Sequence, residues 1–315
     1  MNDLPLITIA LPCYNAESTI RRALQSAIAQ IWTNKEIIIV DDSSEDYSRE
    51  VVLSCIANIP YARLIKNETN LGPGGTRDLL LNEAQGELIA FFDDDDESLP
   101  ERLQKQFERI TEYESKTKES VIACYASGIR HYPNGYKKEL IAIGSEPVIP
   151  KGSGMAASIL FYGRRDDWFY GAGTPTCCLM ARTAVLKQVG GFDKNFRRVE
   201  DLDLSIRLAL ADASFIGCKD ILFIQHATAG NDKTSDKNLK AELQLAEKYK
   251  DFLKDRGMYF YAKTWPKIRH YHFSKQYGRF FLTLLTLVIA YPVKTITHLF
   301  DTGPKRFKHE KKMAS

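Results

Sequence analysis

Short continuous apolar runs alternate with segments of helical periodicity along the first hundred residues. The apolar runs cover residues 6–11, 36–40, 62–65 and 88–92. Between them, apolar residues recur every three or four positions over residues 20–28, 47–56 and 76–84. Short apolar runs are typical of strands buried on both faces, and the intervening spacing is typical of amphipathic helices. The pattern predicts an α/β fold whose sheet is mostly parallel and covered by helices.

Beyond residue 103 the regular alternation ends. Three further strands are predicted, at residues 121–125, 177–181 and 221–226. The second of these could join the sheet as an antiparallel member. Helical spacing returns at residues 202–211 and over the charged segment 237–254. Residues 151–173 include five glycines and predict a mobile loop.

The C-terminal part carries the most apolar run of the chain, residues 280–291, which is followed by Pro292 and further apolar residues to Phe300. A membrane-spanning helix needs roughly 18–20 uninterrupted apolar residues, and this run is shorter. Aromatic edges and a basic tail after residue 304 favour a helix that lies in a membrane interface beside anionic lipid. A packed C-terminal helix or an oligomer contact is the alternative.

Composition narrows the class of protein. The 315 residues are 44% hydrophobic and 26% charged, as in an ordinary folded protein, and the net charge of +3 gives no reason to expect a nucleic-acid partner. The six cysteines show neither disulfide nor zinc spacing and predict a reducing compartment. The first residues lack the pattern of a signal peptide. We therefore expect a cytoplasmic protein, peripheral at the inner face of the membrane.

Four consecutive aspartates, Asp93 to Asp96, follow the apolar run 88–92. Carboxylates packed beside a core repel one another unless a cation compensates them, and Mg²⁺ or Mn²⁺ with oxygen ligands is the usual compensation. The carboxyl ends of strands in open α/β sheets are also where ligands bind. The alternative is a solvated acidic turn in which Asp96 or Ser98 caps the helix that follows.

Polar loops follow the other strands at the same edge of the sheet. They comprise residues 12–17, residues 41–44 and the glycine-rich segment 70–77. Together they offer an aromatic face for a base, carboxylates for ring N–H groups and ribose hydroxyls, and an arginine for phosphate. The segment 70–77 has neither the lysine of a phosphate-binding loop nor the dinucleotide fingerprint. The set suits a nucleoside diphosphate held through a metal.

These motifs resemble those of family-2 glycosyltransferases. The residues that carry the resemblance are Leu11–Glu17, Val40–Ser44, Asn70–Gly72 with Arg77, Phe92–Asp96 with Pro100, Gly190–Asp193 and Glu200–Leu204. It covers roughly residues 6–226. The resemblance implies a GT-A fold, with residues 1–103 binding a nucleotide sugar and residues 104–230 binding an acceptor. Residues 231–315 would then be a helical extension.

The resemblance also implies roles for single residues. Asp93 and Asp95 fall on the metal-binding signature, with Asp95 as the direct ligand, and Asp94 would either point away or contact the water shell of the diphosphate. The nucleotide pocket would use Pro12, Tyr14, Glu17, Asp42 and Arg77. Asp201 matches the general base, and Glu200 would orient the acceptor. His226 is a candidate metal ligand or a structural histidine, and Trp168 either stacks on a sugar or packs in the core.

The implied reaction is an inverting, metal-dependent transfer of a sugar, expected to come from a uridine-linked donor, to a hydroxyl of a glycan or lipid-linked glycan in surface polysaccharide assembly. Two other classes stay open. A nucleotidyltransferase would need a basic loop after the first strand, and residues 12–17 contain no basic residue. A non-catalytic sugar-nucleotide-binding protein would not need Asp201 or the four aspartates.

Overall fold

The computed structural model describes residues 4–227 and 234–314, which form two compact units. The first unit contains residues 4–131, 137–156 and 165–227. The second contains residues 132–136, 157–164 and 234–314. Two short segments that we assigned by sequence to the acceptor half, 132–136 and 157–164, thus belong to the second unit.

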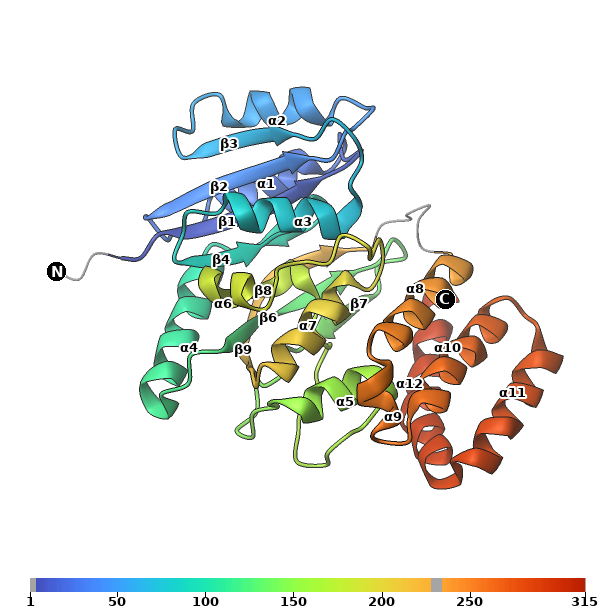
Figure 1. Ribbon diagram of the computed structural model, residues 1–315. Coiled ribbons are helices and arrows are strands. Elements are labelled where there is room, and N and C mark those ends of the chain that lie inside the picture. Colours follow the sequence, from blue (N-terminus) through green and yellow to red (C-terminus); the bar gives the residue numbers. More distant parts are fainter. Residues whose placement is uncertain (1–3, 228–233, 315) are drawn as a thin grey trace. The chain divides into compact units, whose positions relative to one another are not determined.

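The first unit is built on one mixed sheet, to which nine strands of the described residues contribute. In chain order these are β1 (Ile7–Cys13), β2 (Lys35–Asp41), β3 (Ala62–Lys66), β4 (Leu88–Phe91), β5 (Glu97–Ser98), β6 (Ile122–His131), β7 (Lys137–Leu140), β8 (Leu179–Arg182) and β9 (Ser214–His226). The order across the sheet is β3-β2-β1-β4-β8-β6-β9-β5, and β7 pairs with β6 (Figure 1).

Strands β1 to β4 pair in parallel, as the alternation of strands and helices predicted. Residues 37–40 of β2 are fully buried, which explains why this strand reads as an unbroken apolar run. The expected antiparallel member is confirmed, because β8 pairs antiparallel with both β4 and β6. The carboxyl ends of β1, β2 and β4 therefore meet at one edge of the sheet.

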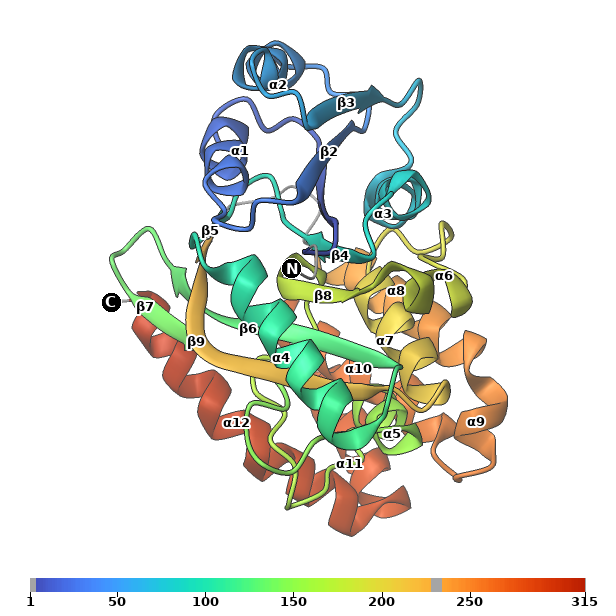
Figure 2. The same ribbon diagram turned by 90° about the vertical axis from the view of Figure 1, so that its left-hand side faces the viewer.

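Helices cover this sheet on both faces. Their bounds are α1 (Ile20–Ile28), α2 (Ser48–Ile56), α3 (Gly72–Glu83), α4 (Arg102–Thr117), α6 (Thr183–Gln188) and α7 (Glu200–Leu210). Helix α5 (Ser153–Phe161) is divided between the two units, because its residues from 157 onward belong to the second. Figure 2 shows α1 and α3 on opposite sides of β2. The face of α1 turned to the sheet carries Ile20, Ala23, Leu24 and Ala27, the spacing on which the prediction rested.

Three local predictions were wrong. Helix α4 begins at Arg102 without any side-chain cap, so neither Asp96 nor Ser98 caps it. Helix α3 begins at Gly72, four residues earlier than expected, because proline is allowed in the first turn of a helix and Pro73 occupies that turn. The glycines beside Pro73 carry no apolar side chains, so the helical periodicity is not visible there. The segment 151–173 is not a continuous loop, since it contains α5.

The second unit is helical. Its helices are α8 (Ser235–Lys248), α9 (Lys250–Lys254), α10 (Tyr259–Phe273), α11 (Tyr277–Ala290) and α12 (Pro292–Ala314). The helix predicted over residues 237–254 is interrupted at Tyr249 and becomes α8 and α9. The buried residues Tyr261, Ile268 and Leu287 join α10 to α11. In the described part of the chain no helix combines the length and apolarity needed to cross a bilayer.

Candidate nucleotide and catalytic site

Asp42 lies in the turn after β2 and organises the segment from residue 67 to residue 72. Its Oδ1 accepts hydrogen bonds of 2.8 Å from the side chain of Asn67 and the backbone N–H of Leu71, and its Oδ2 accepts one of 2.8 Å from the N–H of Gly72. The carboxylate is 3% exposed. An ionised carboxylate has about four acceptor positions, so three of them are used within the chain. Asp42 thus fixes the start of α3, and its role toward a base stays a prediction.

The loop after β1 is held by residues that follow β2. The backbone N–H of Asn15 donates to Ser44 Oγ at 3.0 Å, and that of Tyr47 donates to Glu17 Oε2 at 3.0 Å. Asn15 adopts a left-handed φ of 47°, which asparagine tolerates better than most residues. The Tyr14 side chain is 47% exposed and is therefore accessible for stacking. Pro12, at the end of β1, is partly buried beside Val40.

Asp94 and Asp96 of the acidic cluster point in different directions. The N–H of Tyr14 donates to Asp94 Oδ2 at 3.0 Å, so Asp94 is turned toward the loop after β1. Asp96 accepts hydrogen bonds from the N–H of His226 at 3.0 Å and the side chain of Gln225 at 3.3 Å. Asp96 therefore anchors β9 instead of capping a helix.

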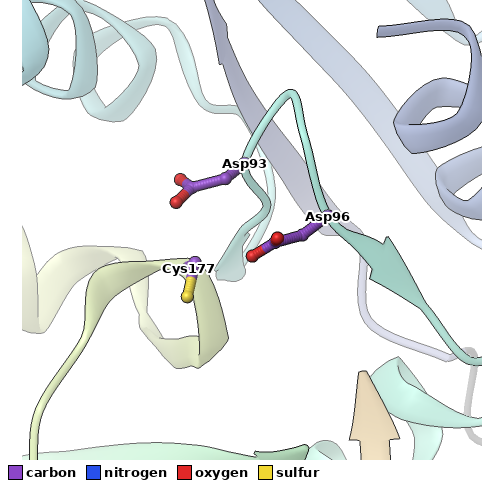
Figure 3. A group of neighbouring side chains, drawn as sticks. All are labelled: Asp93, Asp96 and Cys177. Atoms are coloured by element: carbon purple, nitrogen blue, oxygen red, sulfur yellow. The ribbon is translucent and has the colours of Figure 1, made fainter. Parts of the chain in front are cut away.

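One group in the described residues has the spacing of a metal site. It consists of Asp93, Asp96 and Cys177, each with a potential ligand atom within 4.8 Å of the others. Figure 3 shows Asp93 and Asp96 on the segment between β4 and β5, with Cys177 on the neighbouring turn. Asp95 and His226, the other two predicted ligands, do not belong to this group. Cys177 was not among the predicted site residues, and nothing in the sequence around it indicated this position.

Burial and mutual repulsion raise the pKa values in this cluster. Burial raises the pKa of Asp94 to about 7, and the charges of Asp95 and Asp93 add to the increase. Burial together with the charges of Asp93 and Asp95 raises the pKa of Asp96 to about 8. A hydrogen bond with Cys178, together with burial, raises the pKa of the Cys177 thiol well above its ordinary value. A bound cation would offset this repulsion and would stabilise the ionised carboxylates.

Arg77 connects this cluster to α7. Its guanidinium donates to Asp93 Oδ1 at 2.9 Å and forms a second ion pair with Glu200 Oε1. Arg77 and Glu200 are both buried. Burial lowers the pKa of Arg77, but the charges of Asp93 and Glu200 outweigh it and raise that pKa above its ordinary value. Arg77 had been assigned to base or phosphate; the structure places it between two carboxylates.

Asp201 occupies the first turn of α7, next to Glu200. Burial and the charge of Glu200 raise the pKa of Asp201 to about 6, while the N–H of Leu202 and Arg77 oppose the increase. The helix N-terminus favours a negative charge at this position. Asp203 is completely buried and pairs with Arg207 at 2.9 Å, so it lies below the surface and is held within the chain.

The other two predicted residues have partners of their own. His226 Nε2 lies 2.7 Å from Glu97 Oε1, and its ring packs edge-on against His131. Trp168 is partly buried against Gly154, lies near the ring of Tyr170 and has the guanidinium of Arg165 over its own ring, contacts that agree with the packing interpretation. Glu97 and Asp96 were not predicted as partners of His226, because β5 and β9 are about 130 residues apart in the chain.

A mixed sheet with an acidic cluster at the carboxyl end of β4, followed by a buried carboxylate at the start of α7, defines a GT-A fold of the nucleotide-sugar transferase class. The chain belongs to the family described as "Glycosyl transferase family 2", whose profile matches residues 8–184. The family predicted by sequence is thereby confirmed.

Individual relatives share part of the chain. Succinoglycan biosynthesis protein ExoO of Rhizobium meliloti is 38% identical over 109 residues, which cover 35% of this chain and 31% of that protein. UDP-Glc:alpha-D-GlcNAc-diphosphoundecaprenol beta-1,3-glucosyltransferase WfgD of Escherichia coli is 37% identical over 101 residues, which cover 32% of this chain and 39% of that protein. These matches span well under half the length of either relative.

The fold has a counterpart among solved structures. TarS of S. aureus, residues 1–349 in complex with UDP, superposes with a TM-score of 0.61 at 20% identity, covering 86% of this chain and 73% of that one. The same protein in complex with UDP-GlcNAc gives a TM-score of 0.61 at 19% identity and covers 93% of this chain and 83% of that one. At this level of identity the likeness establishes the fold.

Proposed function

We propose that the protein transfers a sugar from a uridine-diphosphate donor to a hydroxyl of a glycan, with inversion at the anomeric carbon. The observation that carries the proposal is the double ion pair of Arg77, which brings the acidic cluster and the start of α7 into one site. A donor held by the loops after β1, β2 and β4 would then lie beside Asp201. The UDP ligands named for TarS and the UDP-glucose named for WfgD favour uridine over other bases.

Asp201 is the proposed general base. It would accept the proton of the acceptor hydroxyl as the new glycosidic bond forms. With a pKa of about 6 it is a stronger base than an ordinary aspartate, yet it is mostly ionised at pH 7. Glu200 is paired with Arg77, so it would orient the acceptor through that fixed position.

The residues present fit a divalent cation. Asp93 and Asp96 would hold Mn²⁺ or Mg²⁺ through oxygen, with Asp95 retained from the family pattern as a further ligand. Cys177 would contribute little, because its raised pKa keeps it a thiol and hard ions prefer oxygen. When bound, such an ion stabilises negative charge on the departing nucleoside diphosphate.

The second unit suggests where the acceptor is carried. Large apolar side chains that are at least 45% exposed lie on α11 at Phe281, Leu282, Leu285 and Ile289, and on α12 at Val293, Ile296, Phe300 and Phe307. We call these eight residues the apolar stripe. On α11 they recur at helical spacing opposite Leu287, which faces the core. A helix that is apolar on both faces needs a second apolar environment.

Charge indicates what that environment is. Helices α11 and α12 carry seven Lys or Arg residues against one Asp and one Glu. A basic helix with an apolar face binds anionic lipid at the membrane surface. We therefore propose peripheral membrane association and a lipid-linked glycan acceptor in polysaccharide synthesis. The diphosphoundecaprenol acceptor named for WfgD and the succinoglycan pathway named for ExoO support this proposal.

Calorimetric titration of the full chain with UDP, in Mn²⁺ and in EDTA, tests the donor site. We expect binding that requires Mn²⁺. A panel of UDP-sugars with a lipid-linked acceptor, followed by release of UDP, then tests turnover. Asp201→Asn should keep UDP binding and lose about 10²–10⁴-fold in rate. Asp220→Asn, an exposed residue of β9, is the matched control.

Three results would contradict the proposal, each at a different part of it. Full turnover in Asp201→Asn would remove the general base. UDP that does not bind with or without Mn²⁺, while another nucleoside diphosphate does, would change the donor. Binding without turnover by the wild-type chain would instead support a sugar-nucleotide-binding protein that lacks catalysis.

A further inference from the structure

Arg77 occupies a position that joins three parts of the first unit. The residue lies on α3, its partner Asp93 follows β4, and its partner Glu200 begins α7. Glu200 is 123 positions away in the chain. The guanidinium is planar and presents its donors in a fixed fork, so its two terminal nitrogens can hold two carboxylates at a constant separation.

The three charges depend on one another. All three side chains are at least 74% buried, since the exposed fractions are 10% for Arg77, 26% for Asp93 and 11% for Glu200. A buried carboxylate without a cationic partner is strongly unfavourable. Without Arg77, Asp93 and Glu200 would have to take up protons, change their positions, or draw in water.

We infer that Arg77 is a positioning residue, which ties the donor-binding loop after β4 to the first turn of α7 and so sets the separation between the proposed metal ligands and the proposed base. This inference rests on the proposed function. It differs from the role predicted by sequence, in which Arg77 touches the nucleotide. Arg77 acts through Asp93 and Glu200.

The position of Arg77 also affects Asp201. The charged and titratable groups that face Asp201 are Glu200 on the same helix, Arg77 on α3 and the phenol of Tyr125 on β6. Glu200 disfavours the ionised form of Asp201, and Arg77 favours it. Removing the charge of Arg77 while Glu200 stays in place should raise the pKa of Asp201.

Two substitutions of Arg77 separate charge from geometry. Arg77→Met removes the charge, so the acid limb of the kcat/KM profile should move up by about one pH unit, and kcat should fall at least about tenfold. Arg77→Lys keeps the charge, so the acid limb should stay near pH 6. A single ammonium group cannot hold both carboxylates in the fork geometry, so kcat should still fall.

The matched control is Arg63→Met. Arg63 also pairs with a carboxylate, Glu83, at 2.8 Å, but this ion pair is about 40% exposed and lies outside the site. Neither the acid limb nor kcat should change in this variant. A purely structural role for Arg77 would lower the yield or the melting temperature of both Arg77 variants without moving the acid limb.

A second readout does not need turnover. Carboxyl NMR of the chain labelled with ¹³C-aspartate, with the Asp201 signal assigned by its loss in Asp201→Asn, reports the titration of Asp201 directly. Its midpoint should rise in Arg77→Met and stay in Arg77→Lys. If the wild-type chain shows no turnover, the proposed function fails, while this titration still tests the inference.

An Arg77→Met variant whose Asp201 midpoint and kcat both match those of the wild-type chain would overturn the inference. If Arg77→Met does not fold, Arg77→Lys decides the question, because unchanged kcat in that variant would show that the double ion pair is not needed.

Discussion

Asp201 shows how one residue acquires its chemistry from its surroundings. An aspartate in water has a pKa near 4 and is a weak base. At the start of α7 burial and the neighbouring Glu200 raise that pKa to about 6, while Arg77 and the N–H of Leu202 limit the increase. The result is a carboxylate that is more basic than usual and still ionised in neutral solution.

The rate should therefore depend on pH in a defined direction. The proposed base works only when deprotonated, so kcat/KM should rise as pH increases through about 6 and fall tenfold per pH unit well below it. A steady-state profile from pH 4.5 to 8 measures this. The residual rate of Asp201→Asn should lack this limb, and an identical limb in that variant would assign the titration to another group.

At the scale of elements, the contact between α3 and the segment before α7 depends on a missing side chain. A Cβ atom at Gly74 would lie 2.8 Å from the carbonyl oxygen of Phe196 and 2.9 Å from that of Asp193. Real Cβ atoms do not approach backbone this closely, and neither partner is a flexible side-chain end. The glycine allows α3, which carries Arg77, to approach the chain that leads to Glu200.

Gly74→Ala should accordingly destabilise the fold by about 1–3 kcal/mol, even though alanine favours helix. Gly278→Ala is the matched control, because Gly278 also lies in a helix but has open space around it. That variant should be neutral or slightly more stable. Urea unfolding of both measures the free energy of unfolding, and equal stability of the two variants would show that the α3 contact adapts without cost.

Much of this fold could be predicted because its strands are buried on both faces and its helices on one. The continuous runs of β1, β2 and β4 and the spacing of α1 follow directly from that burial. The parallel order of these strands also predicted that the candidate site lies at the edge of the sheet where their carboxyl ends meet. The contacts that define the site could not be predicted, since Arg77 and Glu200, or Asp96 and His226, are brought together only by the tertiary fold.

At the scale of the whole chain, apolar surface and positive charge are concentrated in the same two helices. The apolar stripe lies on α11 and α12, and these helices also hold the basic residues that follow Pro304. Pro292 begins α12 directly after Tyr291, which ends the apolar run of α11. The C-terminal part thus offers two short apolar faces with basic neighbours, which suits the boundary between lipid headgroups and acyl chains.

Binding to vesicles should need both features. The wild-type chain should sediment with vesicles that contain phosphatidylglycerol, and added salt should weaken this binding. Phe281→Ser with Leu285→Ser should abolish it by removing apolar contact, and Lys311→Gln with Lys312→Gln should reduce it and its salt dependence. Leu53→Ser, an exposed leucine of α2, is the control. Equal binding to neutral vesicles would contradict the electrostatic part.

The carboxylate of Asp42 has a consequence for the thermodynamics of ligand capture. Because it already holds Asn67 and the N–H groups of Leu71 and Gly72, the backbone of this segment is ordered before any nucleotide arrives. A ligand that binds there would restrict few further backbone torsions. Binding would therefore avoid most of the loss of conformational entropy that accompanies folding on binding. Nucleotide binding at this edge should therefore proceed without folding of the segment, and its heat-capacity change should be small.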